Sequence, residues 1–382
     1  MTISGADEPI ALIGPHPPFR GGIAHFTERV RSGLQDAGHD VLAVTFSRLY
    51  PDRFFPGKSQ YEETDGGNTT AYPILDSINP LSWSKTANLI IEKGARTAIF
   101  MYWMPFFAPA YRAIARRLRK RGVRIIGVVH NAIPHERHVG DRAFSKRFIQ
   151  SCDAVIVLSE SVRKDVLKLV PEISVRLQQH PVYDQFGSAI EKSVARSRLN
   201  LDSQGHVLLF FGFIRRYKGL HVLLDSLSRV TQRYPGLTLL VAGEFYDDIS
   251  SYQEQLARLG LRDNVRLEDR YISSGEVGAY FCASDVIVQP YLTASQSGVI
   301  PIAQHFNKPV IATNVGGLAE LNGQNHTVVP AGDPNALADA ILSSLSHKPV
   351  EPHSDRAARD TPSPTWDSFV YGLLEEEIKM DD

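Results

Sequence analysis

The sequence predicts an α/β protein with two doubly wound domains, each built on a parallel sheet. Three observations support this prediction. The chain has 382 residues, which is long for one ordinary domain and sufficient for two. Short apolar runs alternate with segments whose apolar residues recur at helical spacing, and this is the pattern of βαβ units. The alternation stops between residues 185 and 205 and then restarts, which indicates a domain boundary.

Each element follows from its local pattern. Short apolar runs predict the strands Ile10–Gly14, Val41–Phe46, Thr97–Trp103, Val123–Val129, Ala154–Leu158, Val207–Phe211, Leu237–Ala242, Val265–Leu267, Val286–Gln289 and Pro309–Ala312. Helical spacing of apolar residues predicts the helices Ile23–Ala37, Ala108–Arg121, Leu220–Arg233, Ser250–Leu259, Gly275–Ala283 and Pro334–Leu345. Gly38 ends the first helix, and Ser273 with Glu276 has the spacing of a capping box.

These patterns divide the chain into four segments. Residues 1–185 form the first domain, 186–204 a linker, 205–348 the second domain, and 349–382 a tether with a C-terminal helix. The tether contains several prolines, and the amphipathic segment Trp366–Ile378 follows it. A polar stretch at about Leu49–Gly67 interrupts the first domain. Parallel strands with right-handed crossovers then predict two doubly wound domains that face a central cleft.

Composition excludes several classes of protein. The chain has 41 basic and 42 acidic residues and 43% apolar residues, so it is neither disordered nor globally attracted to nucleic acid. Its two cysteines, Cys152 and Cys282, lie too far apart in sequence to indicate a disulfide framework or a cysteine metal site. We find no signal-peptide pattern and no apolar run of membrane-spanning length. We therefore expect a cytoplasmic protein without a nucleic-acid partner.

Four unusual loops follow predicted strands, at the edge where open parallel sheets bind ligands. The first, Pro15–Gly22, ends in the pair Gly21-Gly22 directly before a helix, where backbone amides can approach a ligand. An ordinary turn is the alternative interpretation. In the second loop, His130 ends an apolar strand and is suited to bond a sugar hydroxyl or to exchange a proton near neutral pH. A buried structural histidine is the alternative there.

The other two loops lie in the second half and are suited to phosphate. The loop Gly212–Gly219 carries Arg215, Arg216 and Lys218 between a strand and a helix, and these cations suit a diphosphate. A solvated cationic loop is the alternative. The loop Tyr291–Gly298 has small hydroxyl residues and glycine before a helix, where backbone N–H groups can bind an anion. Two such loops in one domain predict a diphosphate ligand.

An ordered set of motifs resembles the glycosyltransferase group-one (family four) pattern. In the second half these motifs are Gly212–Gly219, Val241–Glu244, Ala283–Pro290, Pro309–Glu320 and Val328–Pro334. In the first half the pairs Gly21-Gly22 and Gly38-His39, and then His130, occur in the expected order. The resemblance extends over nearly the whole chain. It implies a GT-B fold and retaining transfer of a sugar from a nucleotide diphosphate donor to a sugar or lipid-linked acceptor.

The resemblance also assigns roles by position. The second domain would bind the donor, the first would shape the acceptor side, and the segment from Trp366 would return to the first domain. Lys218, with Arg215 or Arg216, would bind the diphosphate, and His130 would contact the transferred sugar. The remaining residues implied for donor or acceptor binding are Gly21, Gly22, Gly212, Glu244, Tyr291, Gln296, Ser297, Gly298 and Val299. Neither a metal nor a cofactor is implied, and no aspartate-x-aspartate motif occurs.

Two departures from the family pattern bear on these roles. Phe213 stands where the family usually has arginine, so Arg215 or Arg216 must supply the guanidinium. The family's two glutamates fall by register on Ala294 and Ile302, whose side chains cannot bind a hydroxyl. Nearby polar residues that could replace them are Ser295, Gln296 and Gln304. The missing glutamates keep a non-catalytic nucleotide-sugar binding scaffold as an alternative to a transferase, and a nucleotide-sugar epimerase on the same fold is a further alternative.

A basic segment lies in the first domain. Its cations are Arg112, Arg116, Arg117, Arg119, Lys120, Arg121 and Arg124. A basic helix on the acceptor domain is suited to contact anionic lipid at the inner face of a membrane and so to meet a lipid-linked acceptor. A solvated helix face is the alternative interpretation.

Overall fold

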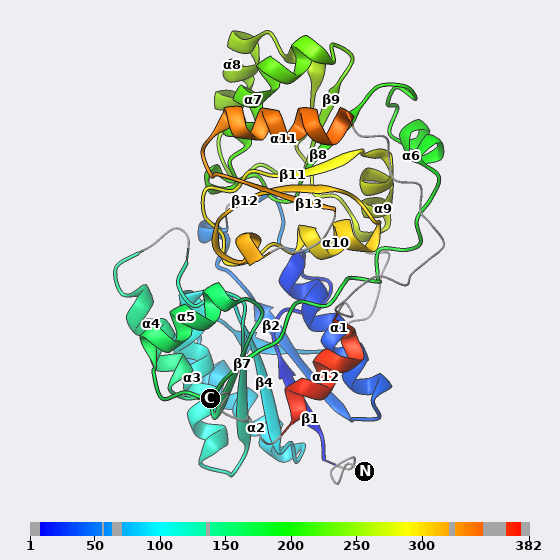
Figure 1. The fold of residues 1–382 in the computed structure, drawn as a ribbon. Helices are drawn as coiled ribbons and strands as arrows, with labels where there is room; N and C mark the ends of the chain where they lie inside the picture. The colour runs from blue at the N-terminus through cyan, green and yellow to red at the C-terminus, as the bar shows by residue number, and fades with distance from the viewer. Residues whose placement is uncertain are drawn as a thin grey trace. The chain divides into compact units, whose positions relative to one another are not determined.

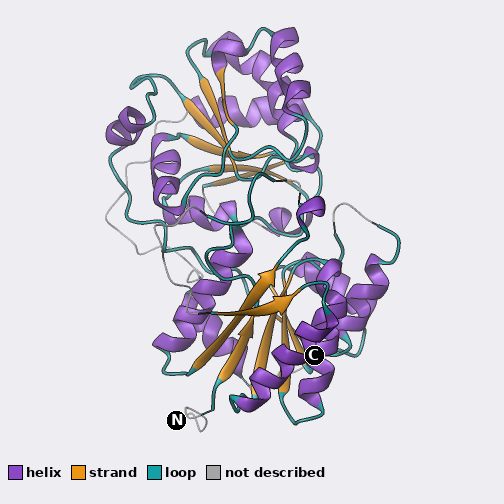
Figure 2. Ribbon diagram, turned by 180° about the vertical axis from the view of Figure 1, so that it is seen from behind, coloured by secondary structure: helices purple, strands orange, loops and turns teal. Residues whose placement is uncertain are grey.

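The computed structural model describes residues 8–55, 57–62, 71–134, 138–320, 325–346 and 364–375. Contacts divide the chain into two compact units: unit 1 is Met1–Pro181 with Pro364–Asp382, and unit 2 is Val182–Ser363. Each unit is a parallel sheet with helices on both faces (Figures 1 and 2). The predicted fold class, two doubly wound α/β domains, is confirmed. None of the helices in these described ranges is long and apolar enough to cross a membrane.

Unit 1 has seven parallel strands in the order β3-β2-β1-β4-β5-β6-β7. They are β1 (Ile10–Ile13), β2 (Val41–Arg48), β3 (Tyr72–Asp76), β4 (Thr97–Tyr102), β5 (Arg124–Val129), β6 (Ala154–Val157) and β7 (Val175–Leu177). Its helices are α1 (Gly22–Asp36), α2 (Pro80–Glu92), α3 (Ala108–Arg119), α4 (Asp141–Ile149), α5 (Glu160–Leu169) and α12 (Trp366–Leu374), with 3₁₀ turns at Asp52–Phe54 and Pro105–Phe107. The order reverses between β1 and β4, which pair directly.

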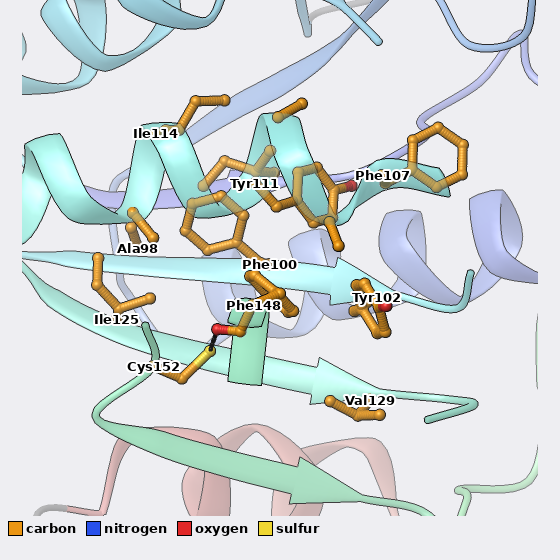
Figure 3. Packing of buried hydrophobic residues seen from close by; sticks show 14 of the residues in the cluster. Ala98, Phe100, Tyr102, Phe107, Tyr111, Ile114, Ile125, Val129, Phe148 and Cys152 are labelled. Atoms are coloured by element: carbon orange, nitrogen blue, oxygen red, sulfur yellow. Dashed lines mark hydrogen bonds between the residues drawn. The ribbon is translucent and has the colours of Figure 1, made fainter. Parts of the chain in front are cut away.

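The core of unit 1 contains an aromatic cluster between the sheet and two helices (Figure 3). Phe100 of β4, Tyr111 of α3 and Phe148 of α4 are fully buried, with ring centroids 5.1 to 5.9 Å apart. The hydroxyl oxygens of Tyr102 and Ser145 are 2.8 Å apart. Since a buried hydroxyl costs free energy unless it is hydrogen-bonded, this pair stabilises the end of β4. The packing therefore holds the carboxyl end of this strand in place.

Unit 2 has six parallel strands in the order β10-β9-β8-β11-β12-β13. They are β8 (Val207–Phe211), β9 (Thr238–Ala242), β10 (Val265–Glu268), β11 (Val286–Gln289), β12 (Val310–Thr313) and β13 (His326–Val329). Its helices are α6 (Lys192–Arg198), α7 (Leu220–Arg233), α8 (Ile249–Leu259), α9 (Ser274–Ala283), α10 (Val299–His305) and α11 (Pro334–Ser346), with 3₁₀ turns at Arg216–Lys218, Arg262–Asn264 and Gly316–Glu320. The capping box at the start of α9 is confirmed, because the Glu276 carboxylate accepts hydrogen bonds from the hydroxyl and the N–H of Ser273.

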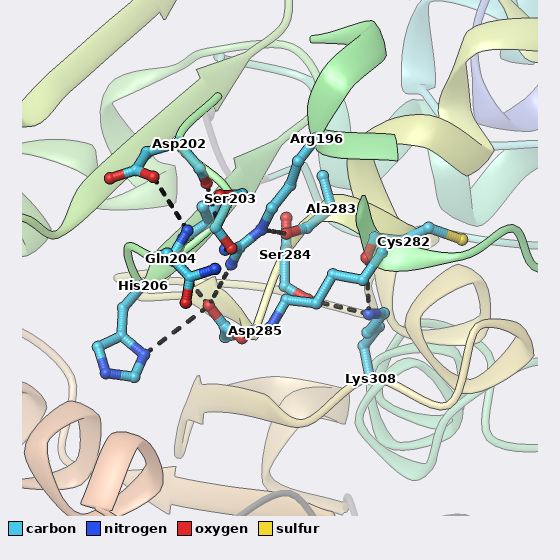
Figure 4. Close-up of polar contacts among 12 residues, drawn as sticks. Arg196, Asp202, Ser203, Gln204, His206, Cys282, Ala283, Ser284, Asp285 and Lys308 are labelled. Atoms are coloured by element: carbon cyan, nitrogen blue, oxygen red, sulfur yellow. Dashed lines mark hydrogen bonds and ion pairs between the residues drawn. The ribbon is translucent and has the colours of Figure 1, made fainter. Parts of the chain in front are cut away.

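The segment predicted as a linker is not plain coil, because it contains α6 and is fastened to unit 2. The Arg196 side chain is 3% exposed and donates to the carbonyl oxygens of Ala283 (3.1 Å) and Ser203 (2.8 Å). It also donates to the Asp285 carboxylate at 2.9 Å (Figure 4). The same carboxylate accepts the Val207 N–H at 2.7 Å. The sequence pattern missed α6 because its anchoring depends on these contacts with a distant part of the chain.

Helix α12 packs on α1 within unit 1. The rings of Phe26 and Phe369 are 5.4 Å apart in an edge-to-face arrangement. A Cβ added at Gly33 would lie 2.8 Å from Val370 Cγ2, so the two helices approach closely at this glycine. The end of the predicted amphipathic segment, residues 376–378, and residues 349–363 of the predicted tether lie outside the described residues.

Several elements were not predicted: β3, β7, β13, α2, α4 and α5. Strands β3, β7 and β13 have a partner on one side only, and such edge strands do not need a continuous apolar run. Strand β3 also contains Pro73, which is tolerated at an edge. The start signal of α2 was present in the sequence, since the Asn79 side chain accepts the Leu81 N–H and Pro80 opens the helix.

Candidate functional site

The strand order of unit 2 places side by side the two loops that were predicted to bind phosphate, Gly212–Gly219 and Tyr291–Gly298. Strands β8 and β11 are neighbours at the point where the order reverses, and ligands bind at such a point in open α/β sheets. The Leu292 N–H donates to the Tyr217 carbonyl at 2.7 Å. A Cβ added at Gly212 would lie 3.3 Å from Lys218 Nζ and 3.9 Å from Val299 Cγ2. The loops after β8 and β11 therefore lie next to each other and form one surface.

Lys218 is the central cation of this surface. Its Nζ lies 5.6 Å from the centroid of the Tyr291 ring, and among the described residues no carboxylate is within 4 Å of it. Burial, and then the positive charge of Arg215, lower the pKa of Lys218 to about 7. A cation that is desolvated without a carboxylate partner gains most from an anionic ligand.

We expect nucleoside diphosphate binding to take up a proton at about pH 8. The pKa of Lys218 near 7 leaves the amine mostly neutral there, and a bound diphosphate favours the protonated form. The affinity should therefore fall by up to about tenfold per pH unit above 7, because the phosphate groups have already lost their last proton at about pH 6. Calorimetry in two buffers of different ionisation enthalpy measures the proton count. Proton uptake that persists in Lys218→Met would contradict the assignment.

Arg215 and Arg216 occupy different environments. Arg215 is half-buried, it acts on the pKa of Lys218, and its guanidinium carbon lies 5.0 Å from the Tyr246 ring centroid. Arg216 is exposed, and its charge acts instead on His221. The structure therefore brings Arg215 into the group around Lys218, while Arg216 faces the side of α7.

Ser297 organises the fourth loop. Its hydroxyl donates to Gln289 Oε1 at 2.7 Å and accepts the Val299 N–H at 3.2 Å. Gln289 is fully buried, and its Nε2 has no hydrogen-bond acceptor among the described residues. The Val299 amide, which the resemblance assigns to phosphate, is thus partly engaged within the loop. Its neighbour Gly298 has helical backbone angles directly before α10.

The positions of the family's glutamates are apolar and covered. Ala294 and Ile302 are 7% and 6% exposed. Of the polar candidates, Gln304 turns toward β13, where its amide lies 3.5 Å from His326 Nε2. Ser295 is buried and its carbonyl accepts the Gly317 N–H at 3.0 Å. Glu244, at the end of β9, is also buried.

Two glycines of the site require their lack of a side chain. Gly219 has φ 74°, and a Cβ there would lie 1.9 Å from the Pro290 carbonyl oxygen. At Gly243, a Cβ would lie 2.2 Å from the Gly212 carbonyl oxygen. Close backbone approach thus holds the loops after β8, β9 and β11 together.

Gly219→Ala should reduce stability more than Gly260→Ala. Both residues have positive φ, but a Cβ at Gly260 would meet no atom within 4 Å. The matched control therefore carries only the backbone strain, about 1 kcal/mol, whereas Gly219→Ala should cost at least about twice that. Urea unfolding of both variants measures the difference. Equal losses would contradict the close approach at Pro290.

The first-half candidates belong to unit 1. Gly21 has φ 104° and caps α1, and a Cβ added at Gly22, the first residue of this helix, would meet no atom outside the helix backbone within 4 Å. In the same loop His16 is buried, with its Nδ1 3.3 Å from the Glu28 carboxylate. Burial alone raises the pKa of a carboxyl group, but hydrogen bonds from His16 and Arg31 outweigh it and lower the pKa of Glu28 to about 2. The contact between Glu28 of α1 and His16 therefore fastens the loop Pro15–Gly22 to this helix.

His130 is a neutral, packed histidine. It is 4% exposed, its backbone N–H donates to the Tyr102 carbonyl at 2.8 Å, and the centroid of its ring lies 4.7 Å from that of Phe26. Burial and the neighbouring His180 lower its pKa to about 3. Proton exchange near neutral pH, one of the two functional interpretations drawn from the sequence, is therefore not supported, whereas the alternative of a buried structural histidine agrees with this packing. The other functional interpretation, a hydrogen bond between the neutral ring and a sugar hydroxyl, is compatible with this pKa.

Sequence reasoning missed two residues of the unit 2 site. Gln289 ends the otherwise apolar run of β11, which is the same signal that singled out His130. Tyr246 follows β9 and contacts both Phe213 and Arg215. Its contacts depend on strand pairing, so no local pattern marked it.

Comparisons with known proteins agree with this geometry. The family model described as Glycosyl transferases group 1 matches residues 205–347, and the one described as Glycosyltransferase Family 4 matches residues 20–180. A curated D-inositol 3-phosphate glycosyltransferase of Corynebacterium urealyticum is 27% identical over 226 residues, 56% of this chain and 53% of that protein. The enzyme of that name from Segniliparus rotundus is 34% identical over 131 residues, 34% of this chain and 29% of that protein. The chain thus spans about half, or less, of the length of these relatives.

Solved structures share the fold. Sucrose-phosphate synthase of Thermosynechococcus elongatus has a TM-score of 0.67 at 20% identity, covering 88% of this chain and 90% of that one. Anabaena HepE, solved in complex with UDP, has a TM-score of 0.63 at 16% identity, covering 96% and 94%. The two sheets and these likenesses define a protein of the GT-B class. The chain belongs to the group 1, or family 4, glycosyltransferases, a retaining family.

Proposed function

We propose that this chain transfers a sugar, with retention, from a nucleotide diphosphate donor to a hydroxyl acceptor in glycan, polysaccharide or glycolipid biosynthesis. The observation that carries the proposal is Lys218, a half-buried cation at the switch point of unit 2 that has no carboxylate partner in the described part of the chain. Arg215 is the guanidinium that joins it. Unit 2 is the donor-binding domain in this proposal, and unit 1 supplies the acceptor side.

Charge stabilisation is the main catalytic contribution in this proposal. As the bond from the anomeric carbon to the leaving phosphate oxygen breaks, negative charge grows on the diphosphate, and Lys218 and Arg215 stabilise it. The acceptor oxygen forms its bond to the anomeric carbon on the same face, and its proton passes to the leaving phosphate oxygen. His130, neutral at pH 7, is limited to a hydrogen bond with the transferred sugar.

A donor panel tests the proposal. UDP-, GDP- and ADP-sugars are added to the full chain, and the one that binds should raise the melting temperature with increasing concentration. UDP is the first nucleotide to test, because HepE was solved with UDP and with UDP-glucose. Inositol 3-phosphate is the first acceptor, because it appears in the names of the curated relatives.

The product then separates the three hypotheses. Acceptor-dependent release of the nucleoside diphosphate supports the transferase. An epimeric sugar formed without acceptor indicates the epimerase, and binding without any turnover indicates the scaffold. No stabilisation by any of the three donors would contradict a donor site in unit 2.

We also propose that the protein works in the cytoplasm, at an anionic membrane surface. Both cysteines are buried free thiols, as a reducing compartment allows. Of the seven cations between Arg112 and Arg124, Arg119 pairs with Asp153, and Arg124 donates to the Glu375 carbonyl. The other five have no carboxylate partner among the described residues.

Anionic vesicles test the membrane contact. The full chain should sediment with phosphatidylglycerol vesicles at low salt and not with phosphatidylcholine vesicles, since each basic residue near the surface contributes about 1 kcal/mol. Exchanging Arg116, Arg117 and Lys120 for glutamate should abolish sedimentation. Equal sedimentation of the wild type with neutral vesicles would reject the electrostatic contact.

A further inference from the structure

The pairing of β8 and β9 continues beyond both strands. The Ile214 N–H donates to the Glu244 carbonyl at 2.9 Å, and the Tyr246 N–H donates to the Ile214 carbonyl at 2.9 Å. Ile214 and Phe245 form a parallel bridge, and both side chains are buried in the core of unit 2. Two loops thus run together as a short extension of the sheet, with one face toward the core.

The opposite face of this extension carries the aromatic and cationic side chains. Because successive side chains of an extended chain point to opposite faces, Phe213 and Arg215 lie on the face away from Ile214. The Phe213 and Tyr246 rings are stacked, with centroids 4.7 Å apart and planes 28° apart. The Arg215 guanidinium carbon lies 5.0 Å from the centroid of the same Tyr246 ring, which is a cation–π contact.

We infer that Tyr246 is a positioning residue for the donor diphosphate, because it holds Arg215 beside Lys218. The inference rests on the proposed function. Phe213 stands at the position where the family usually has arginine. Arg215 comes two residues later, and because every second side chain of an extended chain points to the same face, it lies on the same face as Phe213. A long guanidinium side chain acts at a diphosphate only when its position is fixed, because the planar group binds phosphate oxygens in a defined geometry. The Tyr246 ring, itself fixed by its stack on Phe213, provides that support.

Replacing the ring tests the inference. Tyr246→Leu should weaken the binding of inorganic pyrophosphate about three- to tenfold, the size of a cation–π contact of this kind. Tyr246→Phe keeps the ring face and should stay within about twofold of the wild type. The matched control is Tyr234→Leu, which removes a ring 5.8 Å from Arg233 in the same unit and should leave pyrophosphate binding unchanged. Pyrophosphate contains no base or sugar, so it reports on the diphosphate contacts alone.

A double-mutant cycle shows whether Tyr246 acts through Arg215. Adding Tyr246→Leu to Arg215→Gln should weaken pyrophosphate binding no further, within about twofold. An undiminished effect of Tyr246→Leu on that background would overturn the inference. So would a selective loss of UMP, GMP or AMP binding with pyrophosphate binding intact, because Tyr246 would then be a direct contact of the base. Failure of the wild type to bind pyrophosphate and all three nucleoside diphosphates would instead reject the proposed function.

Discussion

Lys218→Met is expected to lower kcat/KM for the nucleotide-sugar donor by about 10²-fold or more, the usual effect of removing one preorganised charge-stabilising group. Methionine keeps the apolar stem beside Tyr291 and removes only the ammonium group. The loss should appear mainly in kcat, because negative charge on the leaving diphosphate is larger in the transition state than in the bound donor. Steady-state kinetics with the donor found in the panel measures both constants.

The control for this variant is Arg233→Met. Arg233 is an exposed cation at the far end of α7, the helix that begins just after Lys218. Arg233→Met removes one positive charge from the same domain, as Lys218→Met does. Its kcat/KM should stay within about twofold of the wild type, as expected for a screened surface charge. Equal losses in the two variants would show that Lys218 acts only through the general field of the domain. An unchanged kcat/KM in Lys218→Met would reject the diphosphate site.

Asp285→Asn is expected to reduce the free energy of unfolding of unit 2 by about 3 kcal/mol, the range for removing one partner of a buried ion pair. The variant leaves the guanidinium of Arg196, 3% exposed, without its counter-charge. It also weakens the anchor that joins α6 to the start of β8 through the Val207 N–H. Urea unfolding followed by circular dichroism measures the loss. All three tryptophans lie in unit 1, so tryptophan fluorescence should shift less.

Asp339→Asn is the matched control for this prediction. Asp339 pairs with Arg229 at 2.6 Å, but its side chain is 61% exposed, and such pairs contribute about 1 kcal/mol or less. Combining Asp285→Asn with Arg196→Met should recover part of the lost stability, because the buried charge is then absent as well. A loss in Asp285→Asn no larger than that of the surface control would contradict the structural role of this carboxylate.

Local patterns were sufficient for most of the fold. The interior strands are apolar runs because both faces of a parallel sheet are covered; they are β1, β2, β4, β5, β6, β8, β9, β11 and β12. Helices α1, α3, α7, α8, α9 and α11 show their amphipathic spacing directly. The edge strands β3, β7 and β13 and the helices α2, α4, α5 and α6 were missed. For α6 the reason is that its stability depends on contacts with residues far along the chain, such as the bond from Arg196 to Asp285. Local sequence does not contain that information.

The sequence by itself determined the two-domain α/β architecture and the loops that carry glycine and positive charge. The proposal of Arg215, and not Arg216, as the guanidinium for the diphosphate required the tertiary structure, because strand order and pairing decide which face each side chain takes. The protonation states also required it: burial lowers the pKa of His130 to about 3 and that of Lys218 to about 7. Desolvation depends on the surroundings of a group in three dimensions, and a linear pattern of residue types does not specify those surroundings.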